Sequence, residues 1–255
     1  MSGISFDLKG RKALVTGGSR GIGRAIALRL AEAGCDVAIN YLRNKGPARE
    51  TAEMVEAHGQ KALLLKCNVA NVENLGAMFD EIREHFGHLD VIVSNAASGV
   101  IKPAMELTRR HWQWTMDINA AALLPIAQHG APLMAGRGGQ IIAVSSLGAQ
   151  RAIPNYAAVG ASKAALESLV RHLAVELAPE KIRVNAISAG VVDTDALSHF
   201  PNREQLLEES ERRTPAGRLT VPADVADTVL YLASPLASQV VGQTLVVDGG
   251  YAIMG

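Results

Sequence analysis

One tyrosine and one lysine in the middle of the chain have the types and spacing for proton chemistry. Tyr156 and Lys163 are seven positions apart in the segment SSLGAQRAIPNYAAVGASK, residues 145–163. Seven helical steps of about 100° come to about 700°, so both side chains can project from one face. An ammonium beside a phenol favours the phenolate and makes the hydroxyl a better donor to a substrate oxygen. An ordinary helix with a half-buried tyrosine and a solvated lysine fits the same spacing.

A glycine-rich turn near the start of the chain has the pattern of a phosphate site. Residues 12–16 are a short apolar run, GGSRGIG follows, and an amphipathic pattern over 24–33 ends at Gly34. Glycines are needed where a pyrophosphate approaches the backbone, and the N–H groups of the helix N-terminus then face it. A bland turn is the alternative, but the strand–turn–helix context favours a dinucleotide site. Its predicted contacts are Gly17, Ser19, Arg20, Gly21, Ile22 and Gly23.

The end of the second apolar run, residues 36–40, bears on the choice of cofactor. A carboxylate there would bind a ribose 2′-hydroxyl and repel a 2′-phosphate. The sequence continues instead as Asn40-Tyr41-Leu42-Arg43, without an acid. Arg20 and Arg43 can each offer a fork of donors to a 2′-phosphate, or both can be solvated surface residues. The sequence therefore predicts NADPH rather than NADH, with Tyr41 and Arg43 in its site.

These residues depend on a regular alternation of strands and helices. Strand-like runs cover 12–16, 36–40, 61–66, 91–94, 140–144, 182–187 and 243–247, with helical patterns between them. Such alternation implies right-handed crossovers and a parallel sheet with helices on both faces. Ligands bind beyond the carboxyl ends of such strands. The predicted cofactor contacts at two of these ends are Asn68, Val69, Asn95, Ala96 and Ala97.

Prolines and one asparagine stand out in the helical stretches. We expect Pro125 and Pro132 to bend or end the long stretch 107–134, and Pro154 to lie in the first turn of the helix that carries Lys163. Asn119 is polar within the apolar run MDINAAALL. If it is buried it must find partners, so it is a candidate to hold a water beside Lys163.

Composition excludes several classes of function. The 255 residues contain 25 Lys plus Arg and 25 Asp plus Glu, a net charge of zero, which argues against charge-driven binding to nucleic acid or membrane. Cys35 and Cys67 lack metal-ligand spacing and are expected to be buried free thiols in a reducing compartment. No apolar signal core or membrane-length run is evident. We expect one cytoplasmic domain over 1–255 without a metal, and a mobile substrate lid over 195–220.

Together these segments resemble the short-chain dehydrogenase/reductase family over nearly the whole chain. The resemblance implies a Rossmann-type, doubly wound α/β fold with a seven-stranded parallel sheet, and a homotetramer. It also implies cofactor contacts from Gly190, Val192 and Thr194. The residues that carry it are Gly17, Gly21, Gly23, Asn95-Ala96-Ala97, Asn119, Ser145 or Ser146, Tyr156, Lys163, Gly190-x-x-x-Thr194 and Asp248-Gly249-Gly250.

One departure from the family pattern is informative. The usual Tyr-x-x-x-Lys motif would put a tyrosine at position 159, which is Val159 here. The Tyr-x6-Lys spacing of Tyr156 and Lys163 is instead typical of enoyl-acyl-carrier-protein reductases. GAQRAIPNY resembles the type I form, which has another tyrosine where this chain has Ser146. GGSRGIG, NAASGV, SSLG and TPAGR more closely resemble the third, NADPH-dependent FabL type.

The resemblance implies NADPH-dependent reduction of trans-2-enoyl thioesters on acyl carrier protein, in fatty-acid elongation. Tyr156 would stabilise the enolate oxygen, and Lys163 would hold the nicotinamide ribose. Asn119 would place the water that delivers a proton, and Ser145 or Ser146 would orient substrate or nicotinamide. Two alternatives remain. Val159 argues against a 3-ketoacyl or general carbonyl reductase, and the intact tyrosine–lysine pair argues against a non-catalytic nucleotide-binding module.

Overall fold

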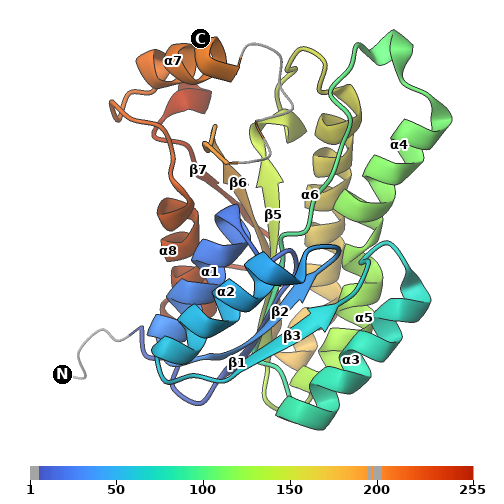
Figure 1. Ribbon diagram of the computed structural model, residues 1–255, viewed down its shortest axis with the longest axis vertical. Coiled ribbons are helices and arrows are strands. Elements are labelled where there is room, and N and C mark those ends of the chain that lie inside the picture. Colours follow the sequence, from blue (N-terminus) through green and yellow to red (C-terminus); the bar gives the residue numbers. More distant parts are fainter. Residues whose placement is uncertain (1–5, 195–196, 198–202, 255) are drawn as a thin grey trace.

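A parallel sheet runs through the centre of the computed structural model, which describes residues 6–194, 197 and 203–254. Within these residues it has seven strands in the order β3-β2-β1-β4-β5-β6-β7 (Figure 1). The α/β doubly wound prediction is confirmed. The strands are β1 Lys12–Val15, β2 Asp36–Tyr41, β3 Ala62–Lys66, β4 Val91–Ser94, β5 Gly139–Ser146, β6 Ile182–Ala189 and β7 Thr244–Val247.

Helices cover both faces of this sheet. On one face α3, α5 and α6 contribute Phe79, Ile126 and Leu166 to a buried apolar cluster. On the other face α1, α2 and α8 supply a second cluster, which contains Ile26 and Val229 (Figure 1). The helices are α1 Gly21–Glu32, α2 Lys45–Ala57, α3 Val72–Phe86, α4 Arg109–Met116, α5 Leu123–Met134, α6 Ala157–Leu177, α7 Arg203–Arg213 and α8 Pro222–Ala233.

The strand order creates a switch point between β1 and β4. From β1 the chain winds outward to β3, and then returns to place β4 on the other side of β1. Crossovers leave in opposite directions at this point, so the carboxyl ends of β1 and β4 border a crevice where ligands bind in such folds. Strand β5 extends to Ser146, further than its apolar run predicts, and pairs with β6 up to Ala189.

The stretch over 107–134 is interrupted ahead of its two prolines. Helix α4 ends at Met116, a π-helical turn spans Asp117–Ala121, and α5 follows with Pro132 inside it. Pro125 lies in the first turn of α5 and cannot donate to the carbonyl oxygen of Ala121, the last residue of the π-helical turn. Single π-helical turns often mark functional positions in helices, and this one contains the buried Asn119.

The predicted lid over 195–220 is only partly described. Residues 195–196 and 198–202 lie outside the described part, and 203–213 form helix α7 rather than irregular structure. Both cysteines are buried and free. In the described part of the chain no group of His, Cys, Asp and Glu is suited to hold a metal ion. Nor does any helix there have the length and apolar character needed to cross a membrane.

Candidate active site

The glycine turn between β1 and α1 is shaped for close approach of a ligand. Gly17 and Gly21 have φ of 63° and 53°, which side chains rarely adopt. A Cβ at Gly23 would lie 2.2 Å from the Gly17 carbonyl oxygen, so only glycine fits there. Asn95, just after β4, donates from Nδ2 to the carbonyl oxygens of Thr16 and Gly17 at 3.0 and 3.2 Å. The turn therefore has the form that a dinucleotide pyrophosphate requires.

Asn40 is a supporting residue whose role the sequence did not reveal. It is buried at the end of β2 and accepts from the Gly17 N–H at 3.3 Å. Its Nδ2 donates to the carbonyl oxygens of Leu65 and Cys67. Asn40 thus ties the glycine turn to the end of β3. The signal was present as a polar residue at the end of an apolar strand.

Arg20 and Arg43, the two arginines predicted to bind a 2′-phosphate, both lie at the surface. Arg20 is the N-cap residue of α1 and is exposed, and Arg43 is exposed just beyond β2. Tyr41 is buried in β2. The neighbouring Arg24 serves the turn itself, because its Nε donates to the Ser19 carbonyl at 3.2 Å and to Thr51 at 2.9 Å.

The other predicted cofactor contacts lie at carboxyl ends of strands. Asn68 turns the chain after β3 by accepting from the Ala70 N–H at 3.1 Å. Thr194 lies against the glycine turn, since a Cβ on Gly21 would be 3.5 Å from its methyl group. A Cβ on Gly190 would lie 2.9 Å from Asp248 and from Thr220 Oγ1, so this position also requires glycine. Of the remaining predicted contacts, Val69 and Val192 are buried, Ile22 and Ala96 are partly buried, and Ala97 is exposed.

Tyr156 does not lie within α6 but immediately before it. It is the N-cap residue, and Asn155 before it has a φ of 63°. Pro154 lies in the preceding turn, so its predicted place in the first helical turn is wrong. The Tyr156 ring packs on Gly148, where a Cβ would lie 2.5 Å from ring carbon Cε1. Its hydroxyl is 3.3 Å from the Ser146 hydroxyl.

Lys163 is buried, with 6 % of its surface exposed. Its ammonium donates to the Val144 carbonyl of β5 at 2.7 Å. Burial lowers the Lys163 pKa to about 8, and the Glu167 carboxylate acts in the opposite direction. Burial raises the Tyr156 pKa, and the hydrogen bond with Ser146 partly opposes this. The Tyr156 pKa thus moves away from the phenolate, and Lys163 is not among the groups that shift it.

The structure separates the roles of the two serines. Ser146 faces the Tyr156 hydroxyl, whereas Ser145 Oγ donates to Glu167 Oε1 at 2.6 Å. Adjacent residues of a strand point to opposite faces, and Ser145 shares its face with Ile141 and Ala143, which pack in the cluster that includes α6. Ser146 is the serine placed for contact with a ligand beside Tyr156.

Asn119 is buried in the π-helical turn, and its side chain is engaged. Its Oδ1 accepts from the Ser98 N–H at 2.8 Å, and its Nδ2 donates to Ser162 Oγ at 3.0 Å. Ser162 in turn donates to the Val159 carbonyl at 2.7 Å. Asn119 therefore joins the loop after β4 to α6 beside Lys163.

Val159 occupies the position of the usual family tyrosine and is packed away from the Tyr156 hydroxyl. It is buried, and a Cβ built on Gly99 would lie 2.3 Å from its Cγ2. Val159 thus fills the space beside Gly99 in the loop after β4. The valine side chain has no proton to donate, so the candidate acid is Tyr156, at the start of α6.

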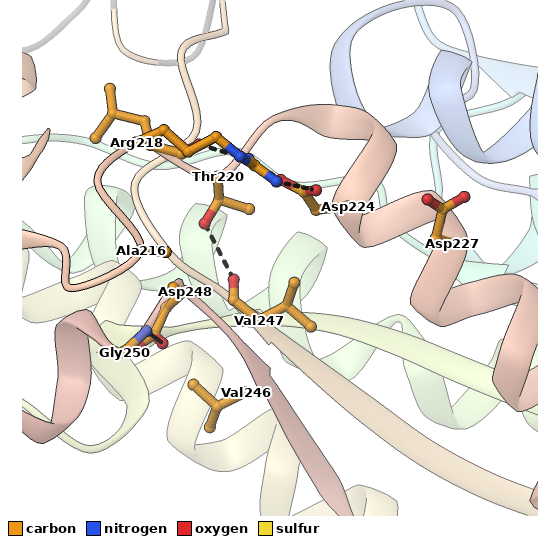
Figure 2. A pocket seen from close by; sticks show the side chains of 11 residues that line it. Ala216, Arg218, Thr220, Asp224, Asp227, Val246, Val247, Asp248 and Gly250 are labelled. Carbon is orange, nitrogen blue, oxygen red and sulfur yellow. Dashed lines mark hydrogen bonds and ion pairs between the residues drawn. The ribbon is translucent and has the colours of Figure 1, made fainter.

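A separate pocket of about 410 Å³ lies at the end of β7, where Figure 2 shows Arg218 paired with Asp224. Thr220 and Val247 are also hydrogen-bonded in its wall. Its lining includes neither Tyr156 nor Lys163. The buried lysine and the tyrosine make a better candidate for chemistry than this hollow, whose charged groups are already paired.

Comparison with known proteins decides the family. A family model described as "Enoyl-(Acyl carrier protein) reductase" matches residues 17–252. The chain belongs to the short-chain dehydrogenase/reductase family. Among its members, 1-cyclohexenylcarbonyl-CoA reductase of Streptomyces collinus is 41 % identical over 94 % of this chain and 86 % of its own. The NADH enoyl-acyl-carrier-protein reductase FabI of a Nostoc species is 38 % identical over 98 % of this chain and 99 % of its own.

Solved structures of the short-chain dehydrogenase/reductase family superpose closely. The Bacillus cereus enoyl-acyl-carrier-protein reductase, with NADP⁺ and an indole naphthyridinone, is 33 % identical, has a TM-score of 0.92 and covers 99 % of this chain and 100 % of its own. A 7α-hydroxysteroid dehydrogenase with NADH and a 7-oxo steroid is 32 % identical, has a TM-score of 0.92 and covers 96 % of both chains. This protein is therefore an oxidoreductase of a nicotinamide-dependent family, near the enoyl reductases.

Proposed function

We propose that this enzyme uses NADPH to reduce trans-2-enoyl thioesters on acyl carrier protein, in fatty-acid elongation. The observation that carries the proposal is the placement of the Tyr156 hydroxyl. Tyr156 precedes α6 with its hydroxyl beside Ser146, while Val159 is packed against Gly99. The phenol thus stands three residues before the position that carbonyl reductases of the family use, and just outside the helix that carries that position.

The reaction itself explains why that displacement matters. Bound NADPH would supply a hydride to C3 of the enoyl group, which leaves negative charge on the C1 carbonyl oxygen. In carbonyl reduction, by contrast, the carbon that takes the hydride bears the oxygen that is protonated. A tyrosine is neutral at neutral pH, and burial raises the Tyr156 pKa further from that range, so Tyr156 can donate to the enolate oxygen as an oxyanion-hole group does. A water molecule held near Asn119 would then give a proton to C2, which completes the reduction.

Lys163 supports this chemistry by holding the cofactor. With a pKa of about 8, its ammonium is mostly charged at neutral pH. One N–H bonds to Val144, which leaves further donors for the hydroxyls of the nicotinamide ribose. Asn119 fixes the neighbouring loop through Ser98 and Ser162. It acts through position rather than by direct proton transfer.

NADPH is the proposed cofactor because of the residues after β2. The segment Asn40–Arg43 lacks a carboxylate, Arg20 is exposed in the glycine turn, and Arg43 is exposed just beyond β2. The solved relatives bind NADP⁺ in one case and NADH in another, so the preference belongs to this chain's own residues. The FabL type, cytoplasmic location, homotetramer and substrate lid remain parts of the proposal that rest on the sequence.

The deciding experiment compares two substrates and two carriers. NADPH oxidation is followed with crotonyl and acetoacetyl thioesters side by side, each on acyl carrier protein and on coenzyme A. We expect turnover of the crotonyl group and little of the acetoacetyl group, with acyl carrier protein preferred. Faster turnover of the acetoacetyl group would make the enzyme a carbonyl reductase, and equal use of both carriers would remove acyl carrier protein as its partner.

A carbonyl reductase is the second candidate, and one observation favours it. A hydroxynaphthalene reductase-like protein of Metarhizium anisopliae is 38 % identical over 96 % of both chains. Val159 weighs against this activity here, because it removes the acid from the usual position. The same assay separates the two candidates.

A further inference from the structure

A buried carboxylate lies one helical turn beyond Lys163. Glu167 is 5 % exposed and follows Lys163 by four residues on α6, so the two side chains share a face. Ser145 is 3 % exposed and donates to Glu167 at 2.6 Å. Val144, the residue before Ser145 in β5, accepts from Lys163 at 2.7 Å. Two consecutive residues of β5 thus anchor two successive charged groups of α6.

Burial of the Glu167 carboxylate lowers the stability of the fold, which an apolar residue at this position would not do. Burying a carboxylate is unfavourable unless it is hydrogen-bonded and opposed by a positive charge. Glu167 accepts a hydrogen bond from the neutral hydroxyl of Ser145, which uses only part of the accepting capacity of its two carboxylate oxygens. The opposite charge is supplied by Lys163, which is itself buried.

We propose that Glu167, anchored by Ser145, is a positioning residue that keeps the Lys163 ammonium charged and directed to the cofactor site. This rests on the proposed role of Lys163 in holding the cofactor. It assigns Ser145 to the support of Glu167 instead of a contact with substrate or nicotinamide. Ser146 and Ser145 then serve Tyr156 and Lys163 respectively.

The charge balance around Lys163 supports this role. Burial lowers the Lys163 pKa to about 8, and among the described residues Glu167 is the charged group that acts to raise it. Without Glu167 the ammonium would lose its proton at a lower pH. The elements that pack against α6 also carry titratable groups, which do not shift the Lys163 pKa: Arg109, Arg110 and His111 of α4, Asp117 of the π-helical turn, His129 of α5 and Tyr156 before α6.

The test measures NADPH binding against pH in the full-length protein, by fluorescence of the bound cofactor. Glu167→Gln keeps the shape and an acceptor for Ser145 but removes the charge. We expect the pH at which binding is half lost to fall by about 1 pH unit. Glu167→Asp keeps the charge and should restore most of the difference. Glu176→Gln, at an exposed glutamate of the same helix, should leave the profile unchanged.

Ser145→Ala gives an independent measurement if Glu167→Gln does not fold. It leaves the charge but removes the anchor, so NADPH binding should weaken several-fold and the half-loss pH should move in the same direction. An unchanged profile in folded Glu167→Gln, or in Ser145→Ala, would overturn the proposal. Because the measurement is of cofactor binding, it remains valid if the enzyme proves inactive on enoyl thioesters.

Discussion

The Tyr156 hydroxyl is the group on which the proposed chemistry depends most directly. Its pKa is raised by burial, so the enzyme presents a neutral donor instead of a phenolate. Ser146, at 3.3 Å, can accept from or donate to this hydroxyl and so set its direction. Burial and the hydrogen bond with Ser146 thus both act on this acid, and the proposal leaves Lys163 to the cofactor.

Tyr156→Phe keeps the ring on Gly148 and removes the donor. We expect turnover of a crotonyl thioester to fall by about 10²–10³, the usual loss for one oxyanion donor. NADPH binding should be unchanged, because Lys163 and the glycine turn are intact. Steady-state kinetics and cofactor titration measure both. Near-normal crotonyl reduction by the folded variant would place the acid elsewhere.

Folding lowers the pKa of Lys163, which gives a prediction for both stability and its pH dependence. Its pKa falls from 10.5 to about 8 on folding, and each pKa unit is worth about 1.4 kcal/mol. The charged form is therefore disfavoured in the folded state by about 3 kcal/mol. Lys163→Met removes this penalty, but it leaves the Val144 carbonyl unpaired, at about 1 kcal/mol, and the buried Glu167 carboxylate without its opposite charge, at about 3 kcal/mol or more. At pH 7 we expect the variant to be less stable than wild type by about 1 kcal/mol or more in chemical denaturation, and to bind NADPH weakly.

The pH dependence checks the same prediction. Between about pH 8 and 10.5 the unfolded wild-type chain binds more protons at Lys163 than the folded chain does, so wild-type stability rises with pH in that window. The stability of Lys163→Met relative to wild type should therefore fall from pH 7 to pH 9.5. A difference that is constant with pH would mean that Lys163 stays charged in the folded protein up to pH 9.5, so that folding does not lower its pKa.

Residue types were predictable from the sequence, but the partners of several residues were not. The tyrosine, the lysine, both serines and Asn119 stood out by type and spacing. Which serine meets Tyr156 depends on the face that each residue of β5 presents, and that face is fixed by how β5 packs on α6. Glu167 looks like one more charge on an amphipathic helix until Ser145 is seen to bond to it.

At the level of elements, the contact between Tyr156 and the turn after β5 positions the acid. The turn Leu147–Ala149 and α6 meet through two glycines. A Cβ at Gly160 would lie 2.6 Å from the Gly148 carbonyl oxygen, and a Cβ at Gly148 would collide with the Tyr156 ring. Small residues here let the helix start approach the strand end closely enough for Tyr156 to reach Ser146.

Gly148→Ala tests this contact. The new methyl group would lie 2.5 and 2.6 Å from two Tyr156 ring carbons, so the ring and its hydroxyl must move. We expect the turnover number to fall by about 10–100-fold, since small displacements of a catalytic group are costly, with NADPH binding retained. Gly46→Ala is the matched control, because nothing lies within 4 Å of a Cβ there. Wild-type turnover in Gly148→Ala would show that the ring position is not critical.

The strands and most helices follow from periodicity, and the exceptions have tertiary causes. The seven predicted runs all form strands, because a doubly wound sheet buries continuous apolar segments. The break between α4 and α5 begins before both prolines, and the sequence did not place its start. The π-helical turn contains Asn119, whose partners Ser98 and Ser162 lie on other segments. Likewise the turn before α6 is set by Asn155, at a positive φ, rather than by Pro154.

At the level of the whole molecule, strand order gathers the cofactor site from distant segments. The ends of β1 and β4 border the place where the chain changes winding direction, and Thr194, in the segment after β6, lies against the glycine turn there. The sequence predicted this arrangement because alternating strands and helices allow few other topologies. It leaves Arg43 exposed beyond β2, at the side of the crevice where the adenosine end of a dinucleotide binds in such folds.

Arg43→Ala should change the cofactor preference without changing the chemistry. Loss of a charge-assisted bond to the 2′-phosphate is expected to raise the KM for NADPH about 10-fold, from about 1.5 kcal/mol for such a bond. The KM for NADH should change little. Arg49→Ala, at an exposed arginine of α2 paired with Glu53, is the control. Equal losses for NADPH and NADH would remove Arg43 from the 2′-phosphate site.

The charge distribution at the start of α4 bears on the carrier. Arg109 and Arg110 occupy the first turn of this helix, which has no acidic residue there. Positive charges at a helix N-terminus are unfavourable by about 0.3–1 kcal/mol each. Both arginines are exposed, as are Lys102 and Met105, the latter by 97 %. A net charge of zero gives no general attraction to an acidic partner, so any attraction must be local, as here.

We therefore expect Arg109→Glu with Arg110→Glu to weaken use of the carrier-bound substrate while leaving the fold intact. Glutamates in the first turn of α4 favour the helix dipole, so thermal stability should be unchanged or slightly higher. The KM for crotonyl-acyl-carrier-protein should rise about 10-fold or more, and this effect should diminish at high salt because screening weakens exposed charges. The KM for crotonyl-coenzyme A is the internal control and should change little. A parallel rise for both substrates, or no rise for either, would mean that acyl carrier protein does not dock at this helix.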